Sequence, residues 1–311
     1  MVRYLQQRAI AAVLVLFGVS ILSFSMIHLL PGDPVQYMFA LTQGPPPSPA
    51  QMQEFRHQLG LDKPVYIQYL DYVWSALHGD FGRSIFLREK VTAILADNLP
   101  YTLNLTLAGL AVTIVFGVPL GVVAAAKHGT WVDSFTMVIS LVGLSMPFFW
   151  LAVLLVLVFS IRLGWFPATG EGSLSRLVLP AFAIGVTSAG TLARLVRSSM
   201  LEVLHQEYVV TARAKGLRES RVLLRHALRN AIIPPVTIMG LQFGRLMGGA
   251  VITEIVFARK GIGTVIINAI LNHDIKLVQG TILFIAVVFV CINFIVDMLY
   301  AVIDPRIKYG G

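Results

Sequence analysis

Six long apolar stretches constrain this chain more than any other feature of its sequence. A stretch of about 20 consecutive apolar residues is long enough to cross the hydrocarbon core of a bilayer as a helix. Stretches of that length occupy residues 9–30, 100–126, 134–161, 178–197, 232–257 and 280–303. Because a spanning segment must satisfy its backbone hydrogen bonds internally, we predict an all-α membrane protein with six transmembrane helices.

The overall composition supports this class. Of the 311 residues, 56% are hydrophobic and 13% are charged, whereas about a quarter of the residues in a typical soluble domain are charged. The net charge of +8 would suit a nucleic-acid partner, but the hydropathy argues against that and for a lipid bilayer. The single cysteine, Cys291, excludes a disulfide framework and a cysteine-based metal site.

The first apolar stretch has a second interpretation as a signal peptide, because Arg3 and Arg8 precede it. Its apolar run is longer than the core of a signal peptide, and no pair of small residues marks a clean cleavage site. We therefore expect a retained anchor. With the N-terminus in the cytoplasm, six spans place both termini there, and basic residues then concentrate in the cytoplasmic loops, as the positive-inside rule requires.

The 31–98 segment, which this topology places on the extracytoplasmic side, is predicted to be helical. Ser48 and Gln51 have the spacing of a capping box, and Gly60 is suited to end that helix in a left-handed conformation. A second helix is predicted from about 64 to 78. Its apolar face, which packs on the protein's own membrane domain or receives a partner, consists of Val65, Tyr69, Tyr72 and Ala76.

We therefore expect four consecutive parts. They are an N-terminal transmembrane helix at 1–30, the extracytoplasmic helical segment at 31–98, a core of five transmembrane helices at 99–303 and a cytoplasmic tail at 304–311. Prolines in the spans of the core permit bending there, and they stand at positions 119, 147 and 180.

The longest cytoplasmic loop, residues 198–231, is predicted to contain two helices. Ser199 and Glu202 form a capping box that starts the first helix, and Gly216 ends it in a left-handed conformation. The second helix runs from about 219 to 231. Its basic side carries Arg218, Arg221, Arg225 and Arg229.

Two interpretations of this loop remain open on these grounds. A basic helix is attracted to anionic lipid at the membrane surface. Ala212 and Ala214, however, keep the first helix narrow beside a glycine turn, so that another protein can approach its backbone closely. A helix that enters a groove on a partner fits this second feature better.

One segment of this loop, EYVVTARAKGL at 207–217, is followed by NAIIP at 230–234. Together they resemble the EAA-type coupling loop of binding-protein-dependent ABC importer permeases, and more narrowly the dipeptide, oligopeptide and nickel permease branch. Supporting motifs stand in the same order along nearly the whole chain, at 30–34 (LPGDP), 59–64 (LGLDKP), 79–82 (GDFG), 163–167 (LGWFP) and 304–309 (DPRIKY). One departure is RKGIG at 259–263, where the branch commonly has a PGLG turn.

The resemblance implies a type I ABC importer permease architecture in the bacterial inner membrane. The implied partners are a second permease, either a paralogue or an identical chain, two ATP-binding cassette subunits or domains, and an extracytoplasmic substrate-binding protein. The loop helix would insert into a cleft on an ATPase subunit, and its coupling residues would be Glu207, Tyr208, Thr211, Ala212, Arg213, Ala214, Lys215 and Gly216. The implied substrates are peptides, with glutathione-like peptides or nickel complexes as alternatives.

The chain itself shows no sign of catalysis. It contains no GxxxxGK[ST] phosphate-binding loop, so we expect ATP and Mg²⁺ on the partner subunits and no cofactor on this chain. Neither a Ser/His/Asp arrangement nor an HExxH motif stands at a usable spacing. We therefore predict a non-catalytic transport subunit with no catalytic residue and no metal site.

The fifth span carries the sharpest packing signal, with Gly240, Gly244 and Gly248 spaced four residues apart. This spacing lets a neighbouring helix approach closely, either within the chain or from the second permease. Arg245 lies beside these glycines, and a charge inside a membrane needs a partner or a wet cavity. The candidates for the translocation path or gate are Arg245, Gln242, Glu254 and Asp297.

Structural roles are the alternatives for these candidates: Arg245 would pair with Asp297 or Asn293, and Glu254 would lie at the membrane interface. Two other classes of protein fit the sequence less well. A secondary transporter would show internal repeats with broken helices in corresponding positions, and we find no such two-half similarity. A membrane-embedded enzyme would show clustered carboxylates or histidines in the spans, and these spans hold few.

Overall fold

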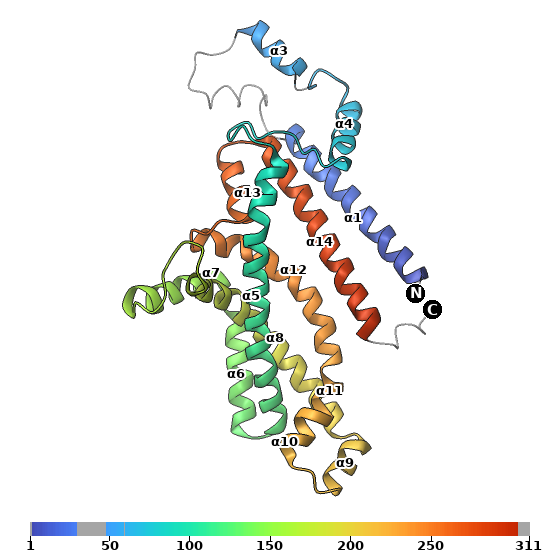
Figure 1. The fold of residues 1–311 in the computed structure, drawn as a ribbon, viewed down its shortest axis with the longest axis vertical. Coiled ribbons are helices and arrows are strands. Elements are labelled where there is room, and N and C mark those ends of the chain that lie inside the picture. The colour runs from blue at the N-terminus through green and yellow to red at the C-terminus, as the bar shows by residue number, and fades with distance from the viewer. Residues whose placement is uncertain (1, 30–47, 59, 304–311) are drawn as a thin grey trace. The chain divides into compact units, whose positions relative to one another are not determined.

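The computed structural model describes residues 2–29, 48–58 and 60–303, and in these ranges the regular elements are helices (Figure 1). The LPGDP motif and the predicted tail at 304–311 lie outside the described residues. Five described helices are long and apolar enough to cross a membrane. They are α1 (Val2–Leu29), α5 (Val91–Ala126), α8 (Leu174–Leu204), α12 (Ile233–Val256) and α14 (Ile275–Ile303).

The third predicted span, 134–161, is not one straight helix. It consists of α6 (Trp131–Ser145) and α7 (Phe148–Leu155), which continues as the π-helix η1 (Val156–Arg162), and the two halves are bent by 100°. The break lies at Met146 and Pro147, because proline disfavours helical backbone in the residue before it, and Met146 is extended. Counted as one span, the bent pair brings the described total to the predicted six.

The chain divides into two compact units. The first contains residues 1–100 and 264–294, and the second contains residues 101–263 and 295–311. Two helices, α5 and α14, have residues in both units. The helix α13 (Ile262–Leu271) begins in the second unit and ends in the first.

In the first unit, the helix predicted after Ser48 is confirmed as α3 (Pro49–Gln58). Its capping box is formed as predicted: the Ser48 amide donates to Gln51 Oε1 at 2.9 Å, and the Gln51 amide donates to Ser48 Oγ at 3.3 Å. Gly60 has a φ of 69°, which is the left-handed conformation expected beyond this helix.

The second predicted helix of this segment is α4 (Val65–Leu77), and it packs on α1. The Tyr69 hydroxyl lies 2.8 Å from Ser20 Oγ, and the Tyr72 hydroxyl donates to Ser23 Oγ at 3.3 Å. Two of the four residues of the predicted face therefore contact the protein's own first helix. The opposite side of α4 exposes Tyr66, Leu70, Trp74 and Leu77.

The start of α14 is fixed by a buried carboxylate. Asp274 accepts hydrogen bonds from the Leu277 amide at 3.1 Å, from the Ser84 hydroxyl at 2.5 Å and from the Phe86 amide at 3.2 Å. It thus caps the helix and holds the loop around the bridge between Arg83 and Lys90.

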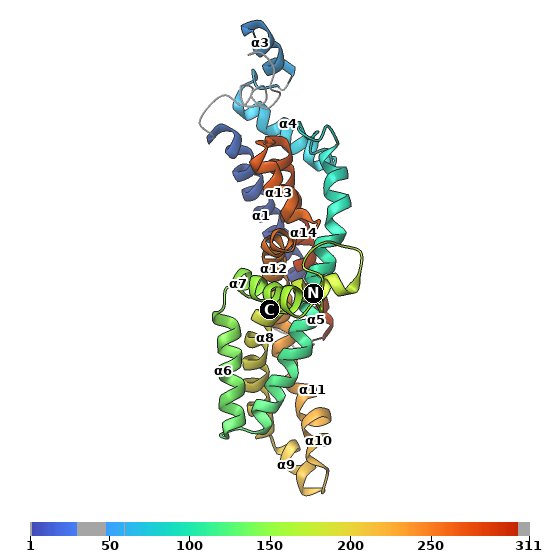
Figure 2. The same ribbon diagram turned by 90° about the vertical axis from the view of Figure 1, so that its left-hand side faces the viewer.

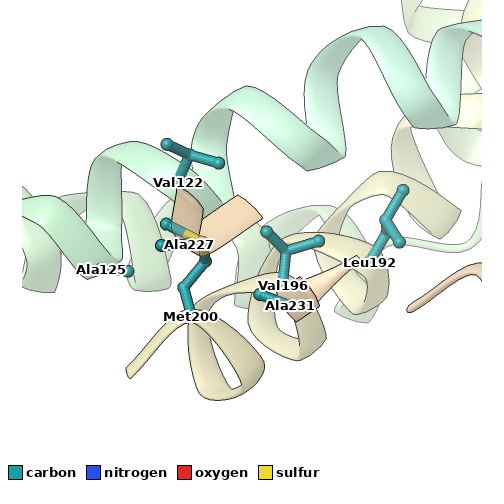
Figure 3. Close-up of a cluster of buried hydrophobic side chains, with 7 residues drawn as sticks. All are labelled: Val122, Ala125, Leu192, Val196, Met200, Ala227 and Ala231. Carbon is teal, nitrogen blue, oxygen red and sulfur yellow. The ribbon is translucent and has the colours of Figure 1, made fainter. Parts of the chain in front are cut away.

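The second unit is built around α8, which contacts α6, α7, α11 and α12. Glycines permit its closest approaches: a methyl group at Gly121 of α5 would lie 2.5 Å from the Ala193 carbonyl oxygen, and one at Gly190 would overlap the Ser140 backbone of α6. Figure 3 shows the hydrophobic cluster where α5, α8 and the following loop meet. Its buried members are Val122, Ala125, Leu192, Val196, Met200, Ala227 and Ala231.

The helix predicted to start at Ser199 starts elsewhere, and this expectation is wrong. Ser199 lies inside α8 and is buried, so it cannot serve as a cap. The reason is tertiary packing: Val196 and Met200 are fully buried in the cluster of Figure 3, and these contacts extend α8 to Leu204. Figures 1 and 2 show the loop beyond this end of α8, and they show α6 running beside α8.

Candidate coupling loop and membrane cavity

The loop begins directly after α8 with the short helix α9 (Glu207–Ala214). Gly216 follows with a φ of 76°, as predicted, and a methyl group built on it would meet nothing within 4 Å. The second predicted helix is confirmed as a continuous helical stretch made of α10 (Glu219–Arg221), the π-helix η2 (Val222–Ala227) and α11 (Leu228–Ala231). The loop is therefore a helical hairpin whose glycine turn is open.

The two arms of this hairpin enclose a small hydrophobic core of their own. Val209 and Ala212 of α9 are buried against Val222 of η2, with Leu204 and Leu217 at the edge. Ala212 thus faces inward and keeps the two arms of the loop close together. The sequence instead predicts it on the outer surface, where it would let another protein approach the helix. The other alanine of the prediction, at position 214, is exposed.

Two polar contacts fix the hairpin further. Arg213 donates from Nη2 to Glu219 Oε1 at 2.7 Å and from Nε to Glu219 Oε2 at 3.2 Å, which closes the turn around Gly216. This hydrogen-bonded pair lowers the pKa of Glu219 and raises the pKa of Arg213. At the base, Asn230 Nδ2 donates to the Tyr208 hydroxyl at 2.7 Å. Arg213 and Tyr208 therefore both have partners within the loop.

The remaining predicted coupling residues form the outer surface of the hairpin. Glu207, Thr211, Ala214, Lys215 and Gly216 are exposed. The Thr211 hydroxyl donates to the Glu207 carbonyl oxygen at 2.9 Å, so it turns back on its own helix. In the part of the chain that the structure describes, the Glu207 carboxylate and the Lys215 ammonium form no ion pair with a neighbour. Two opposite charges and a bare backbone turn are thus presented outward.

The fifth span brings two predicted path residues to one cavity. A cavity of about 190 Å³ lies between α8 and α12, with Gln242 and Arg245 among its lining residues. Gln242 is only 3% exposed, and neither its Oε1 nor its Nε2 has a hydrogen-bond partner among the described residues. Arg245 is exposed, and no carboxylate whose side chain the structure describes pairs with it.

Glu254, the third path candidate, lies in a different environment near the end of the same helix. Its side chain is fully buried, where Oε1 accepts from the Thr102 hydroxyl at 2.6 Å and Oε2 accepts from the Gly263 amide at 2.8 Å. Thr102 Oγ1 also accepts from the Ile262 amide at 2.9 Å. The carboxyl group therefore holds the turn that starts α13, in place of the open position that a gate would occupy in this conformation.

The RKGIG turn makes contacts with the 170–176 loop that could not be predicted from its sequence. Arg259 is 6% exposed and donates from Nη1 to the carbonyl oxygens of Gly170 at 3.1 Å and Arg176 at 3.0 Å. Lys260 donates its amide to Glu171 Oε1 at 2.8 Å. This departure from the family pattern thus ties the turn to the 170–176 loop of the same unit. Thr102 and the 170–176 loop had no sequence signal, because they contact this turn across long stretches of chain.

The glycines of α12 do not all pack against other described residues. A methyl group at Gly248 would meet nothing within 4 Å, so this position is open among the described residues. Its neighbour Gly249, which was not part of the predicted stripe, approaches Ile184 Cγ2 at 3.7 Å. The side chain of Asp297 lies outside what the structure describes. Among the described residues, no group of three or more His, Cys, Asp or Glu side chains is arranged to hold a metal ion.

This fold and loop define an integral membrane permease, and the family models agree. Residues 117–309 match the model of the binding-protein-dependent transport system inner membrane component, and residues 1–106 match the N-terminal model of the same membrane component. Together the two models cover nearly the whole chain. The chain belongs to this family of ABC importer permeases.

Two relatives align over nearly their full length. A Brucella abortus (strain 2308) protein, which carries the provisional name of a peptide transport system permease, is 43% identical over 311 residues, with 97% of this chain and 98% of the relative covered. The glutathione transport system permease protein GsiC of Escherichia coli (strain K12) is 40% identical over 309 residues, covering 99% of this chain and 100% of the relative.

Solved structures show the same fold at low sequence identity. The methionine ABC transporter MetNI in an inward-facing conformation gives a TM-score of 0.58 at 18% identity, covering 68% of this chain and 96% of that chain. An amino acid ABC transporter crystallised with histidines gives a TM-score of 0.50 at 16% identity, covering 69% of this chain and 94% of that chain. These likenesses support the type I importer permease architecture.

Proposed function

We propose that this permease carries peptides across the bacterial inner membrane, powered by separate ATPase subunits that dock on the α9 hairpin. The relatives named for peptide and glutathione transport, at 43% and 40% identity over nearly the whole chain, support a peptide substrate. Glutathione is itself a peptide, so both relatives point to one chemical class. Nickel complexes, the other alternative, have no such relative among the proteins compared above.

The observation that carries the coupling proposal is the outer surface of the hairpin. Its inner face is filled by Val209, Ala212 and Val222, so the hairpin keeps its shape without help from a partner. Its outer face leaves Glu207, Lys215 and the open backbone at Gly216 available. A preformed helix with a bare turn is suited to enter a groove on another protein at little cost in conformational entropy.

The rest of the assembly follows from this docking. ATP and Mg²⁺ would bind on the two ATPase subunits, and an extracytoplasmic binding protein would deliver the substrate. The hairpin and both termini would face the cytoplasm, which agrees with the basic residues between Arg194 and Arg229. A second permease, a paralogue or an identical chain, would complete the path and cover the open position at Gly248 on α12.

A pair of glycine substitutions tests the coupling proposal. Gly216 and Gly129 both have a φ of 76° and both have nothing within 4 Å of an added methyl group, so valine strains the backbone equally at the two sites. Gly129 lies outside the hairpin, in the loop between α5 and α6. In the reconstituted transporter, we expect Gly216→Val to abolish peptide uptake and the stimulation of ATP hydrolysis by the loaded binding protein.

We expect Gly129→Val to retain both activities, because it carries the same strain without altering the docking surface. Equal activity of the two variants would overturn the docking assignment. Assembly is checked in parallel by measuring how much ATPase copurifies with each variant. A loss of copurification confined to Gly216→Val supports docking, since the added side chain then blocks the contact itself.

A further inference from the structure

The cavity between α8 and α12 has polar walls in an otherwise apolar region. Gln242 and Arg245 stand three residues apart on α12, so both side chains lie on the same side of that helix. The facing helix α8 contributes hydroxyl groups, and α6 and α7 add apolar side chains. These lining residues are Thr187, Ser188 and Thr191 on one side, with Leu144 and Phe148 beside them.

Gln242 is the first indication that this cavity binds a ligand. A buried amide without hydrogen bonds costs about 1–3 kcal/mol relative to one that is paired. Both polar atoms of Gln242 are buried and unpaired within the described ranges. The nearby Thr187 hydroxyl already donates to the Ile184 carbonyl oxygen at 2.9 Å, so it can only accept a hydrogen bond from a ligand. The Gln242 amide can therefore both donate and accept hydrogen bonds once a ligand group reaches it.

Arg245 is the second indication, and it specifies the charge of the ligand. It lies near the middle of α12, which runs from Ile233 to Val256. A guanidinium stays protonated at every physiological pH, and its burial in a membrane is costly without an anion or water. Arg245 lines the cavity, and it forms no ion pair with the side chains that the structure describes, which do not include that of Asp297.

We propose that this cavity recognises the free C-terminal carboxylate of a peptide in transit. Arg245 would pair with the carboxylate, since a guanidinium matches its two oxygens with two parallel hydrogen bonds. Gln242 would pair with the last peptide bond, because a side-chain amide complements both the N–H and the C=O of a backbone amide. The apolar walls at Leu144 and Phe148 would contact the terminal side chain.

This assignment rests on the proposed peptide transport and adds a rule of selectivity to it. The same guanidinium repels a terminal ammonium, so the peptide would meet the cavity with its carboxyl end. A peptide whose C-terminus is converted to an amide has lost the charge that Arg245 attracts. The permease would therefore distinguish two ligands that differ in one functional group.

The test compares uptake of a tripeptide and of its C-terminal amide by the complete transporter in proteoliposomes. Each ligand is first loaded to saturation on the binding protein, so that the step after delivery is compared. The wild type is measured beside Arg245→Gln, Arg245→Lys and Gln242→Leu. Arg194→Gln is the control, because Arg194 is exposed on α8 and does not line the cavity.

We expect the wild type and Arg194→Gln to transport the acid about tenfold faster than the amide, as a charge-assisted hydrogen bond implies. Arg245→Gln should lower uptake of the acid to the level of the amide, and Arg245→Lys should restore part of the difference. Gln242→Leu should slow both ligands. If Arg245→Gln does not assemble, the acid-to-amide ratio of Arg245→Lys decides the question.

Three results have distinct meanings. Equal wild-type uptake of acid and amide overturns the carboxylate site while leaving the transport of peptides intact. An Arg245→Gln variant that slows both ligands equally also overturns it, since Arg245 then acts on the fold and not on the ligand. A wild type that accumulates neither peptide with ATP, and whose ATP hydrolysis the loaded binding protein does not stimulate, refutes the proposed function itself.

Discussion

Two short connections in this chain both combine charged residues with glycine, yet they use them in opposite ways. At the 257–263 turn two charged side chains are buried: Glu254 of α12 is covered by the turn, and Arg259 donates to the carbonyl oxygens of Gly170 and Arg176, while Lys260 is exposed. In the α9 hairpin the charges of Glu207 and Lys215 point outward. The two segments look similar in sequence, but Glu254 and Arg259 are buried whereas Glu207 and Lys215 are exposed.

Burial distinguishes a motif residue that stabilises the fold from one that is available to a partner. A buried polar group must find its hydrogen bonds inside the protein, and Glu254 finds them at Thr102 and Gly263. An exposed group on a rigid scaffold has no such need and stays available. On this criterion the 257–263 turn belongs to the framework, and we propose that the outer face of the hairpin is an interface.

The largest effect should come from removing the buried carboxyl group. We expect Glu254→Ala to lower the free energy of unfolding by roughly 3 kcal/mol, since it leaves a cavity and deprives the Thr102 hydroxyl and the Gly263 amide of their acceptor. The measurement is equilibrium unfolding of the purified protein in mixed micelles. The matched variant Glu207→Ala, on the exposed hairpin, should change the free energy of unfolding by less than about 0.5 kcal/mol. Similar losses of stability in the two variants would contradict the distinction between the buried Glu254 and the exposed Glu207.

A smaller effect is expected at the other inward-pointing charge. Arg259→Met removes two hydrogen bonds to backbone carbonyl oxygens while preserving much of the side-chain volume, so it should destabilise the protein by about 1–2 kcal/mol. The neighbouring Lys260→Met should be nearly silent, because the Lys260 side chain is exposed and only its amide contacts Glu171. If Lys260→Met costs as much in the same unfolding experiment, the turn is not held by the Arg259 side chain.

Much of this architecture could be predicted from the sequence, because it depends on local rules. Apolar stretch length identified the spans, the Ser48 capping box located α3, and the glycine at 216 ended α9 in the left-handed conformation. The break at Met146 agrees with the proline that follows it, although its angle of 100° depends on packing. These features need little information from distant parts of the chain.

The expectations that proved wrong failed because of contacts between distant parts of the chain. Ser199 had the spacing of a helix cap, but burial of Val196 and Met200 carried α8 past it. Ala212 was expected on the outer surface, and its contact with Val222 placed it inside. In the candidate site, the sequence identified Gln242 and Arg245 individually. Their shared cavity with the hydroxyls of α8 depends on packing between helices that no local pattern specifies.

The smallest effect is expected in the exposed ion pair of the hairpin. The pKa of Glu219 is lowered by its hydrogen bond to Arg213, so its contribution to stability is complete above the unfolded-state pKa of about 4.3 and disappears as the pH falls through the lower folded-state pKa. Because both side chains are largely exposed, we expect Glu219→Gln to cost less than about 0.5 kcal/mol at pH 7. Unfolding of both proteins at pH 7 and pH 3 measures this, and a difference that grows on acidification would contradict the assignment.

The most direct test of the docking surface is the accessibility of its tip. Ala214→Cys and Leu174→Cys, each in a Cys291→Ser background, place a single thiol on the hairpin or at the opposite end of α8, where Leu174 is 83% exposed. The rate of maleimide labelling is measured with and without the assembled ATPase subunits. We predict that assembly slows labelling of Ala214→Cys at least about tenfold and leaves Leu174→Cys unchanged, since a docked groove excludes the reagent. Equal labelling of Ala214→Cys in the two states of an active transporter would contradict the proposal that ATPase subunits couple through this hairpin.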